Sequence, residues 1–308
     1  MVVGMFVLTD APDAVRAALG APIVAAEADV LSAAEAWAWS ELGLGDSPHR
    51  ATLDRAPAWS GPIVVAGYAP SSQFVRLQQA LAAGDAVPDG LVALALDGAR
   101  FRGQRGRTWA TLRGNLHASV HLALDLPAAP TQAALAVLPA VAAARAIERA
   151  SDGRVRPGLK WVNDLLLDDR KAGGVLSATS VDVGRVRHLL QGIGLNVAAL
   201  PDVPASPRAL APARLADVDP SFAGPDAWGR LLAPLLEEIA SARDALEQGE
   251  AEALVDAYRE RAAFLGRHVV IWPVDEADDG RPIAEGRVEA LLPDLSLVLA
   301  GHDTPIRH

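Results

Sequence analysis

The stretch LKWVNDLLLDDRKAGGVL, residues 159–176, decides how the rest of the chain is interpreted. Its two apolar runs flank the turn-forming residues 168–170, a pattern that predicts a β-hairpin. Polar side chains interrupt the strands at four positions: Lys160, Asn163, Asp164 and Lys171. Such groups cost free energy in a half-buried strand unless they find partners, so we expect a bound ligand, although a purely structural polar cluster stays open. Gly173 and Gly174 would leave room for that ligand.

The two lysines of this stretch are the only lysines in the sequence. The sequence has 28 lysines and arginines in total, and all the others are arginine. The abundance of alanine, glycine and proline points to a GC-rich genome, in which arginine replaces lysine wherever a generic positive charge is sufficient. Lysine is a compact, rotatable point charge that the planar guanidinium group cannot imitate in a tight site. We therefore predict a specific role for Lys160 and Lys171.

Composition sets the class of protein. The chain has 308 residues, of which 51% are hydrophobic and 21% charged, the composition of an ordinary globular protein with a full-sized core. It contains no cysteine, which excludes disulfides, thiolate metal sites and a cysteine nucleophile. The net charge of −10 argues against a nucleic-acid partner, so any anion site has to be a local concentration of positive charge.

Targeting signals are not evident. The first residues, MVVGMFVLTD, lack a basic leader, and the longest run of small apolar residues, 133–144, contains Pro139. We expect neither a signal peptide nor a membrane span, and we expect a cytoplasmic protein.

Three regions differ in pattern. Residues 1–58 form an acidic N-terminal extension of unknown role, with a helical stretch around 27–42. In 59–262, short β-like runs mix with amphipathic helices, which predicts an α+β catalytic body. Residues 263–308 contain several short strand-like runs with tight turns and predict a small β-barrel. The proline-rich segment 201–221 is expected to be a mobile loop.

A second segment that could carry chemistry is RFRGQRGRTW, residues 100–109, which with Arg113 brings together five arginines. Gly103 and Gly106 let the backbone bend and approach a ligand closely. Guanidinium groups and exposed amides together suit phosphates or a carboxylate, while a solvated basic loop is the alternative. The spacing is not that of a dinucleotide-binding fingerprint.

Weaker signals lie nearby. GNLHAS at 114–119 and GIGLN at 192–196 each embed an asparagine in an apolar run, which invites a specific hydrogen bond. His117 and His121 have the spacing of a helical metal pair, but their segment alternates like a strand and supplies no third ligand. No serine stands in a G-x-S-x-G context, so a hydrolase elbow is unsupported.

Taken in order, these segments resemble the biotin protein ligase family from Ser71 to the C-terminus. PSSQ at 70–73 is similar to the family's D-S-T-N turn, and RFRGQRGRTW is similar to its G-R-G-R-x-G-R-x-W loop. GNLHAS, KWVNDLLLDDRKAGGVL and GIGLN resemble the remaining three motifs, in the family's order and at similar spacing. The resemblance implies a mixed β-sheet packed with helices, like that of class II aminoacyl-tRNA synthetases, followed by a C-terminal SH3-like barrel.

The resemblance also implies roles for individual residues. The catalytic residues would be Lys171, Arg102 and Lys160, with Lys171 contacting both the acid's carboxylate and the α-phosphate of ATP. The residues expected to bind the acid and cover the adenylate are Ser71, Ser72, Arg102, Gly103, Gln104, Arg105, Gly106, Arg107, Trp109, Gly174 and Gly192. Those expected to hold the nucleotide are Asn115, Lys160, Asn163, Asp164, Lys171 and Asn196, with Asp164 also binding Mg²⁺.

The sequence departs from the family pattern where the ring of the acid is bound. Gly98 stands where the family has a glutamine, Phe101 replaces the first glycine of the loop, and Gln104 replaces an arginine. The acidic N-terminal region does not look like a DNA-binding domain, which indicates that the chain binds no nucleic acid.

The expected activity is ATP-dependent ligation of biotin, through biotinyl-5'-AMP, to a lysine of the biotin carrier domain of a carboxylase. The altered positions leave lipoate or octanoate as alternative acids, and a non-catalytic ligand-binding relative as a third possibility. Retention of Lys171 argues against the third. A homodimer is a further possibility that the sequence leaves open.

Overall fold

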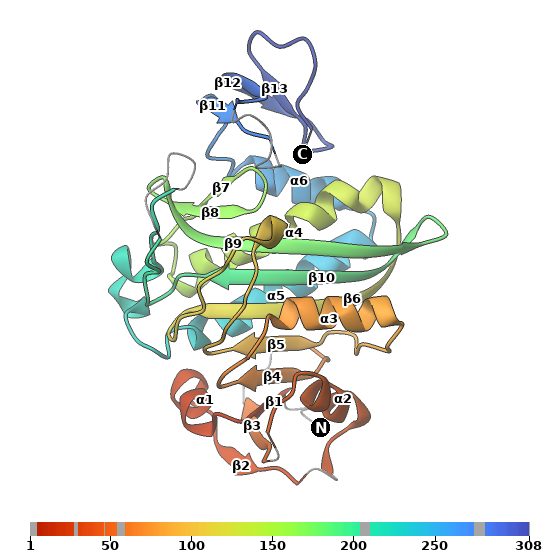
Figure 1. Cartoon of the computed structure of the whole chain (residues 1–308), viewed down its shortest axis with the longest axis vertical. Helices are drawn as coiled ribbons and strands as arrows, with labels where there is room; N and C mark the ends of the chain where they lie inside the picture. Colours follow the sequence, from red (N-terminus) through yellow and green to blue (C-terminus); the bar gives the residue numbers. More distant parts are fainter. Residues whose placement is uncertain are drawn as a thin grey trace.

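A ten-stranded mixed β-sheet forms the body of the protein (Figure 1). The computed structural model describes residues 5–27, 30–45, 47–53, 59–203, 210–273 and 281–307. The strands are β1 Met5–Thr9, β2 Ile23–Ala25, β3 His49–Leu53, β4 Ile63–Ala66, β5 Val92–Ala95, β6 Leu116–Pro127, β7 Gly158–Lys160, β8 Asp164–Leu167, β9 Arg170–Asp182 and β10 Arg185–Leu195. Their order in the sheet is β2-β3-β1-β4-β5-β6-β10-β9-β8-β7, with β1, β4 and β5 parallel and all other neighbours antiparallel. The predicted α+β class with a mixed sheet is confirmed.

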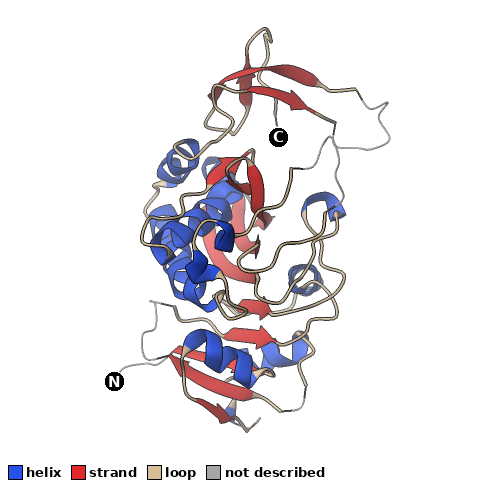
Figure 2. Ribbon diagram, turned by 90° about the vertical axis from the view of Figure 1, so that its left-hand side faces the viewer, coloured by secondary structure: helices blue, strands red, loops and turns tan. Residues whose placement is uncertain are grey.

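Three helices cover one face of the sheet: α4 Ala128–Ala150, α5 Gly229–Glu247 and α6 Ala251–Arg259. Figure 2 shows them gathered on one side, away from the long loops on the other. Helix α4 is long and apolar enough to span a membrane, but 72% of its most apolar window is buried inside the protein, as expected of a core helix. Pro139 has no N–H for the carbonyl of Leu135, and Ser177 Oγ on β9 donates to that oxygen instead (2.8 Å).

The opposite face carries helix α3, Gln73–Ala83, which packs on β5 and β10 (Figure 1). Its buried residue Leu77 joins a second apolar cluster with Leu8, Leu91 and Leu190. Because α3 covers only part of this face, the sheet beside its N-terminal end is left for the loops that follow β5 and β10.

The predicted hairpin over 159–176 is confirmed for strands β8 and β9, with Leu167 paired to Arg170 across the turn. The expected first strand is interrupted, because residues 161–163 form a turn between β7 and β8, and Lys160 and Asn163 therefore lie outside the strands of this hairpin. Asp168 and Asp169 make the turn in the left-handed region, with φ of 46° and 62°, which aspartate adopts more readily than most residues. Strand β9 then continues to Asp182 along β10, so the hairpin is one corner of a much larger sheet.

The N-terminal region is part of the main sheet. Strand β1 pairs in parallel with β4, and β3 and β2 extend the sheet beyond it. The predicted helix around 27–42 is confirmed as α2, Ala33–Glu41, which begins at a capping box formed by Ser32 and Glu35. A second helix, α1 Pro12–Leu19, packs against β3 and α5. The sheet therefore crosses the boundary expected at residue 58, although residues 54–58 lie outside the described part.

The C-terminal region forms a small antiparallel sheet of β11 His268–Ile271, β12 Ala284–Leu291 and β13 Leu297–Leu299. A bridge between Leu297 and Ile306 adds the last residues of the chain to it. Within the described residues this unit is a three-stranded sheet rather than the complete barrel that we expected, and residues 274–280 lie outside them. Trp161 Nε1 donates to the carbonyl of Leu295 (2.8 Å) and ties the unit to the main body.

The proline-rich segment 201–221 is more ordered than expected in its second half. Residues 210–222 contain two short 3₁₀ helices, Leu215–Asp217 and Pro220–Phe222, whose residues Leu215 and Phe222 are fully buried. Residues 204–209 lie outside the described part of the chain.

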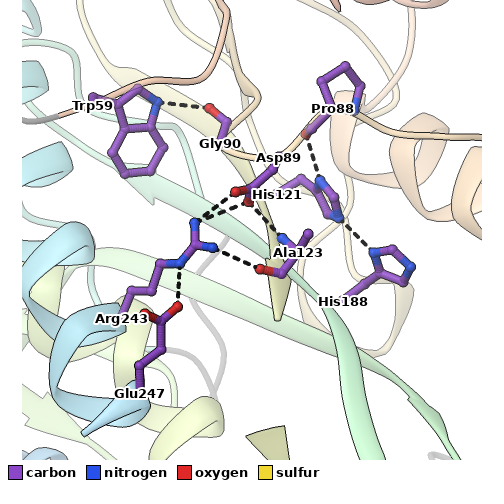
Figure 3. Close-up of polar contacts among 9 residues, drawn as sticks. All are labelled: Trp59, Pro88, Asp89, Gly90, His121, Ala123, His188, Arg243 and Glu247. Carbon is purple, nitrogen blue, oxygen red and sulfur yellow. Dashed lines mark hydrogen bonds and ion pairs between the residues drawn. The ribbon is translucent and has the colours of Figure 1, made fainter. Parts of the chain in front are cut away.

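A polar network joins α5, the loop before β5 and strand β6 (Figure 3). Arg243 binds both oxygens of Asp89 (3.2 and 2.9 Å) and Glu247 (2.9 Å). In the same network, His121 contacts the carbonyl of Pro88 (2.8 Å) and the ring of His188 (3.1 Å). Both nitrogens of His121 are thus engaged, and no group of three or more potential metal-binding side chains occurs among the described residues.

Candidate active site

A cavity of about 470 Å³ lies on the face of the sheet opposite α4. Its floor comes from β6, β8, β9 and β10, its walls from the start of α3 and from the arginine loop, defined here as residues 100–113. Figure 1 shows that loop crossing in front of the central strands. Of the residues expected in the site, the cavity is lined by Ser72, Arg102, Gly103, Gln104, Arg107, Trp109, Lys160, Asn163, Asp164, Lys171, Gly174, Gly192 and Asn196. Ser71, Arg105, Gly106 and Asn115 do not line it.

Glycines make the floor flat enough for aromatic rings to approach the sheet. A Cβ atom at Gly194 would lie 2.5 Å from the Trp109 ring, and one at Gly192 would lie 3.0 Å from the Phe74 ring. The first distance is shorter than carbon atoms tolerate, so position 194 requires glycine, whereas the second is a tight contact to which Phe74 would have to adjust. Gly194 was not among the expected site residues, although it is the second glycine of the GIGLN motif.

The two lysines of the chain converge on one carboxylate. Lys171 Nζ lies 2.6 Å from Asp164 Oδ1, and Lys160 Nζ lies 3.0 Å from Oδ2. Burial by itself raises the pKa of Asp164, but the charges and hydrogen bonds of Lys171 and Lys160 outweigh it, so the pKa lies below its usual value. Lys171 also lies over the Trp109 ring, 5.7 Å from its centroid, a geometry that favours a cation.

The arginine loop closes as a tight hairpin beside this lysine pair. Gly103 N donates to Arg107 O (2.7 Å), and Trp109 N donates to Phe101 O (3.0 Å). At the tip, Arg105 and Gly106 have φ of 59° and 73°, as a tight reversal of the chain requires. The expected bend is found at Gly106 but not at Gly103, whose backbone is extended, and Arg105 at the tip does not line the cavity.

The five arginines of the loop have no carboxylate partner among the described residues. Arg102 donates to the carbonyl of Gly106 (3.2 Å) and Arg100 to that of Pro70 (3.0 Å). Both Arg102 and Arg107 are exposed side chains at the cavity, so their charge is available to an anion there.

The substitutions at 98 and 101 are coupled in space. A Cβ atom at Gly98 would lie 2.7 Å from Cε2 of Phe101 and 2.6 Å from the carbonyl oxygen of Ala69. The Phe101 ring therefore occupies the space that a side chain at 98 would need. Phe101 is buried and lines the cavity, so the wall is apolar at this point.

The three asparagines have different surroundings. Asn163 lines the cavity and donates to Val175 O (3.2 Å), and Asn196 donates to Ala213 O (3.0 Å) while its Oδ1 is buried without a partner among the described residues. Asn115 is different, because its Oδ1 accepts from the backbone at 197 and 199 (both 2.9 Å) and its Nδ2 donates to residue 199 (3.0 Å). Its amide holds the loop after β10, and the expected contact with nucleotide is not supported by this position.

Sequence reasoning missed several residues of the cavity wall. His117, discarded as a metal ligand, points into the cavity region and is 3% exposed. Phe74, Ser119, Leu176 and Asp202 also line the cavity. Ser119 could have been predicted from the sequence, because it lies two residues after His117 on β6 and therefore on the same face of the sheet.

Comparison with known proteins agrees with this geometry. The sequence profile of the Biotin/lipoate A/B protein ligase family matches residues 87–196, which include four of the five motifs. The biotin–[acetyl-CoA-carboxylase] ligase of Paracoccus denitrificans is 30% identical over 201 residues, covering 65% of this chain and 80% of that protein.

Two further relatives define the extent of the similarity. The bifunctional ligase/repressor BirA of Bacillus subtilis is 34% identical over 116 residues, which are 37% of this chain and 35% of that protein, so the chain spans about a third of the length of that relative. The fold is similar to that of the biotin protein ligase from Aquifex aeolicus in complex with biotin and ATP, with a TM-score of 0.59 and 19% identity over 79% of this chain and 94% of that one. The cavity, its motifs and these similarities together show that the chain belongs to the biotin protein ligase family.

Proposed function

We propose that this protein activates biotin with ATP to form biotinyl-5'-AMP and transfers the biotinyl group to a lysine of a biotin carrier domain. The observation that carries the proposal is the convergence of the only two lysines on Asp164 inside a cavity bordered by arginines with no carboxylate partner in the described chain. Such a set of charges suits two anions that must be brought together, a carboxylate and a triphosphate.

In the first step an oxygen of the biotin carboxylate attacks the α-phosphorus of ATP and forms a P–O bond. The bond between the α-phosphorus and the oxygen that bridges to the β-phosphate breaks, and pyrophosphate leaves. Negative charge accumulates around the phosphorus as two anions approach. The ammonium group of Lys171 would stabilise that charge, and donors of this kind typically contribute ~10²–10³ in rate. Arg102 and Arg107, at the cavity wall, would hold the phosphates and cover the adenylate against water.

In the second step the neutral amine of a carrier lysine attacks the activated carbonyl carbon. A C–N bond forms, the C–O bond of the mixed anhydride breaks, AMP leaves, and the amine proton passes to solvent. The carrier domain of a carboxylase is proposed as acceptor because the Paracoccus relative is named as a ligase acting on acetyl-CoA carboxylase. The hairpin loop has to admit one lysine side chain while it keeps water away from the anhydride.

Mg²⁺ is proposed to enter with ATP. Mg²⁺ is usually held by one or two carboxylates together with substrate phosphates, and two carboxylates line the cavity, Asp164 and Asp202. When bound, the ion would neutralise part of the triphosphate charge. Asp164 and Asp202 are the residues that would hold it, and Lys171 lies beside Asp164.

The finer fold assignment belongs to this proposal. We propose that the sheet is related to that of class II aminoacyl-tRNA synthetases and that β11 to β13 belong to an SH3-like barrel. The antiparallel pairing of the three strands and the bridge to Ile306 support the second assignment. The negative net charge supports a protein without a nucleic-acid partner.

The experiment is ATP–pyrophosphate exchange on the full chain, with biotin, lipoate or octanoate as the only acid. We expect exchange with biotin, at a KM below that of the other two acids. Exchange with lipoate or octanoate but not with biotin would identify that acid as the substrate instead. No exchange with any of the three acids would contradict an adenylating enzyme. Transfer is then followed by mass spectrometry of an added carrier domain, which gains the mass of one biotinyl group.

A further inference from the structure

His117 lies where the arginine loop contacts the main sheet. It lies on β6, 3% exposed, and faces two N–H donors of the loop. Trp109 Nε1 lies 3.2 Å from its Nδ1 and Leu112 N lies 3.2 Å from its Nε2, so each ring nitrogen faces one N–H group of the loop. The two donors belong to the returning stem of the hairpin that carries the arginines.

Aromatic packing reaches the other stem. The ring of Phe101 lies edge-on to His117, with the centroids 6.1 Å apart at 62°, and the ring of Trp109 lies at 6.5 Å and 75°. The imidazole therefore contacts the residue at which the hairpin leaves the sheet and the residue at which it returns. Two other hydrogen bonds tether the loop base, from Arg100 to Pro70 and from Thr111 to Gly98, and neither involves a residue that lines the cavity.

The two donors also define the protonation state of the ring. An imidazolium ion has an N–H at both nitrogens, so it could accept a hydrogen bond neither from Trp109 nor from Leu112. A neutral ring has one lone pair, so it accepts from Trp109 or from Leu112 in any one tautomer. Burial lowers the pKa of His117 to about 4, in agreement with a neutral ring that acts as acceptor.

We propose that His117 is a positioning residue that holds the arginine loop closed over the cavity by accepting a hydrogen bond from its returning stem. Trp109 is placed by this contact against Gly194 and beside Lys171, so the loss of the acceptor would loosen the wall that shields the adenylate. The effect on adenylate retention rests on the proposed function, whereas the effect on the loop does not.

The test compares three replacements of the ring. In His117→Asn the amide oxygen stands near the place of Nδ1, and in His117→Gln it stands near that of Nε2, so each keeps one acceptor. In His117→Phe the ring shape remains and both acceptors are lost. A packing role predicts that phenylalanine is the best substitute, and an acceptor role predicts that it is the worst.

The readout is trypsin cleavage at Arg102, Arg105 and Arg107 in the intact chain, located by mass spectrometry. We expect His117→Phe to be cut in this loop roughly tenfold faster than the parent, the order expected when a buried N–H loses its acceptor. At least one amide variant should stay within about twofold of the parent. With biotin and ATP, His117→Phe should also release biotinyl-5'-AMP several-fold faster, with the KM for ATP changed less than the release rate.

The matched control is His121→Phe. His121 lies four residues further along the same face of β6 and is equally buried, but its hydrogen bonds go to Pro88 and His188 rather than to the loop (Figure 3). This variant should lower stability without changing cleavage of the arginine loop. Faster loop cleavage in the control would assign the effect to general loosening and overturn the proposal.

Two other outcomes would also overturn it: parent-like cleavage of His117→Phe, or Asn and Gln variants that are cut as fast as Phe. If His117→Phe does not fold, His117→Ala replaces it, since Asn and Ala both remove the ring and only Asn keeps an acceptor. Equal cleavage of those two contradicts the acceptor role. Absence of biotin exchange in the parent itself refutes the proposed activity and leaves the loop measurement valid.

Discussion

The arginines of this protein fall into two sets that the fold treats differently. On the side of α4 and α5 they are paired: Arg149 with Glu237 and Glu238, and Arg243 with Asp89 and Glu247. In the arginine loop, no described carboxylate pairs with any of them. The protein carries ten more acidic than basic residues, so five arginines in one loop without a carboxylate partner in the described part of the chain mark a place for an anion that comes from outside.

The largest effect that separates the two sets should come from Lys171, the cation that the cavity buries deepest beside the loop. Lys171→Arg keeps the charge but not the compact ammonium that fits between Asp164 and Trp109. We expect biotin-dependent exchange to fall at least ~10²-fold with the fold intact. The control is Arg170→Lys, one residue away and outside the cavity, which should leave the rate unchanged. A parent-like rate for Lys171→Arg would show that the lysine is incidental.

The second effect concerns pH and the attachment of the loop. His117 has a pKa of about 4 when folded and 6.5 in the reference state, so the unfolded chain binds more protons and stability falls as pH falls below 6.5. Between pH 7.5 and pH 5 this linkage amounts to about 2 kcal/mol. Denaturant unfolding at the two pH values should show that loss in the parent and a smaller loss in His117→Asn. The same loss in both proteins would contradict a neutral His117.

A smaller effect is expected from the loop arginines that line the cavity. Arg102→Ala and Arg107→Ala should each raise the KM for ATP or lower exchange by about tenfold, because each removes one charge-assisted contact to phosphate. Their midpoints of unfolding should change little, since each arginine loses only an exposed hydrogen bond within the loop. Arg113→Ala, in the same loop but away from the cavity, provides the control. Equal rates in all three variants would favour a merely solvated basic loop.

The smallest effect should come from the paired set. Arg243→Ala removes the contacts with Asp89, Glu247 and the carbonyl of Ala123, and should lower the free energy of unfolding by about 1 kcal/mol because the network is partly exposed. Exchange activity should be unchanged. A loss of activity comparable to that of Arg102→Ala would break the distinction between the two sets.

Much of the site was predictable because its motifs are local. The hairpin of β8 and β9 follows from apolar runs around a turn, and the bend of the arginine loop follows from Gly106. Lys160 ends β7, Asp164 begins β8 and Lys171 lies on β9, so their meeting required only that these three neighbouring strands pair in register.

What could not be predicted depends on partners far away in sequence. The parallel pairing of β1 with β4 makes the N-terminal region part of the sheet, and nothing local to residues 1–58 specifies it. Asn115 was expected at the nucleotide from the resemblance to the family, but the backbone 82 and 84 residues further along the chain binds its amide. The role of His117 likewise depends on where Trp109 and Leu112 return to the sheet, which alternation along β6 does not reveal.

The most direct test of the central claim is a crystal structure of the full chain grown with biotin and ATP. We expect biotinyl-5'-AMP in the cavity, with Lys171 Nζ within hydrogen-bond distance of the α-phosphate and Arg102 or Arg107 bound to the same anion. An adenylate bound elsewhere on the sheet, or one in the cavity while the Lys171 ammonium still faces only Asp164, would contradict it.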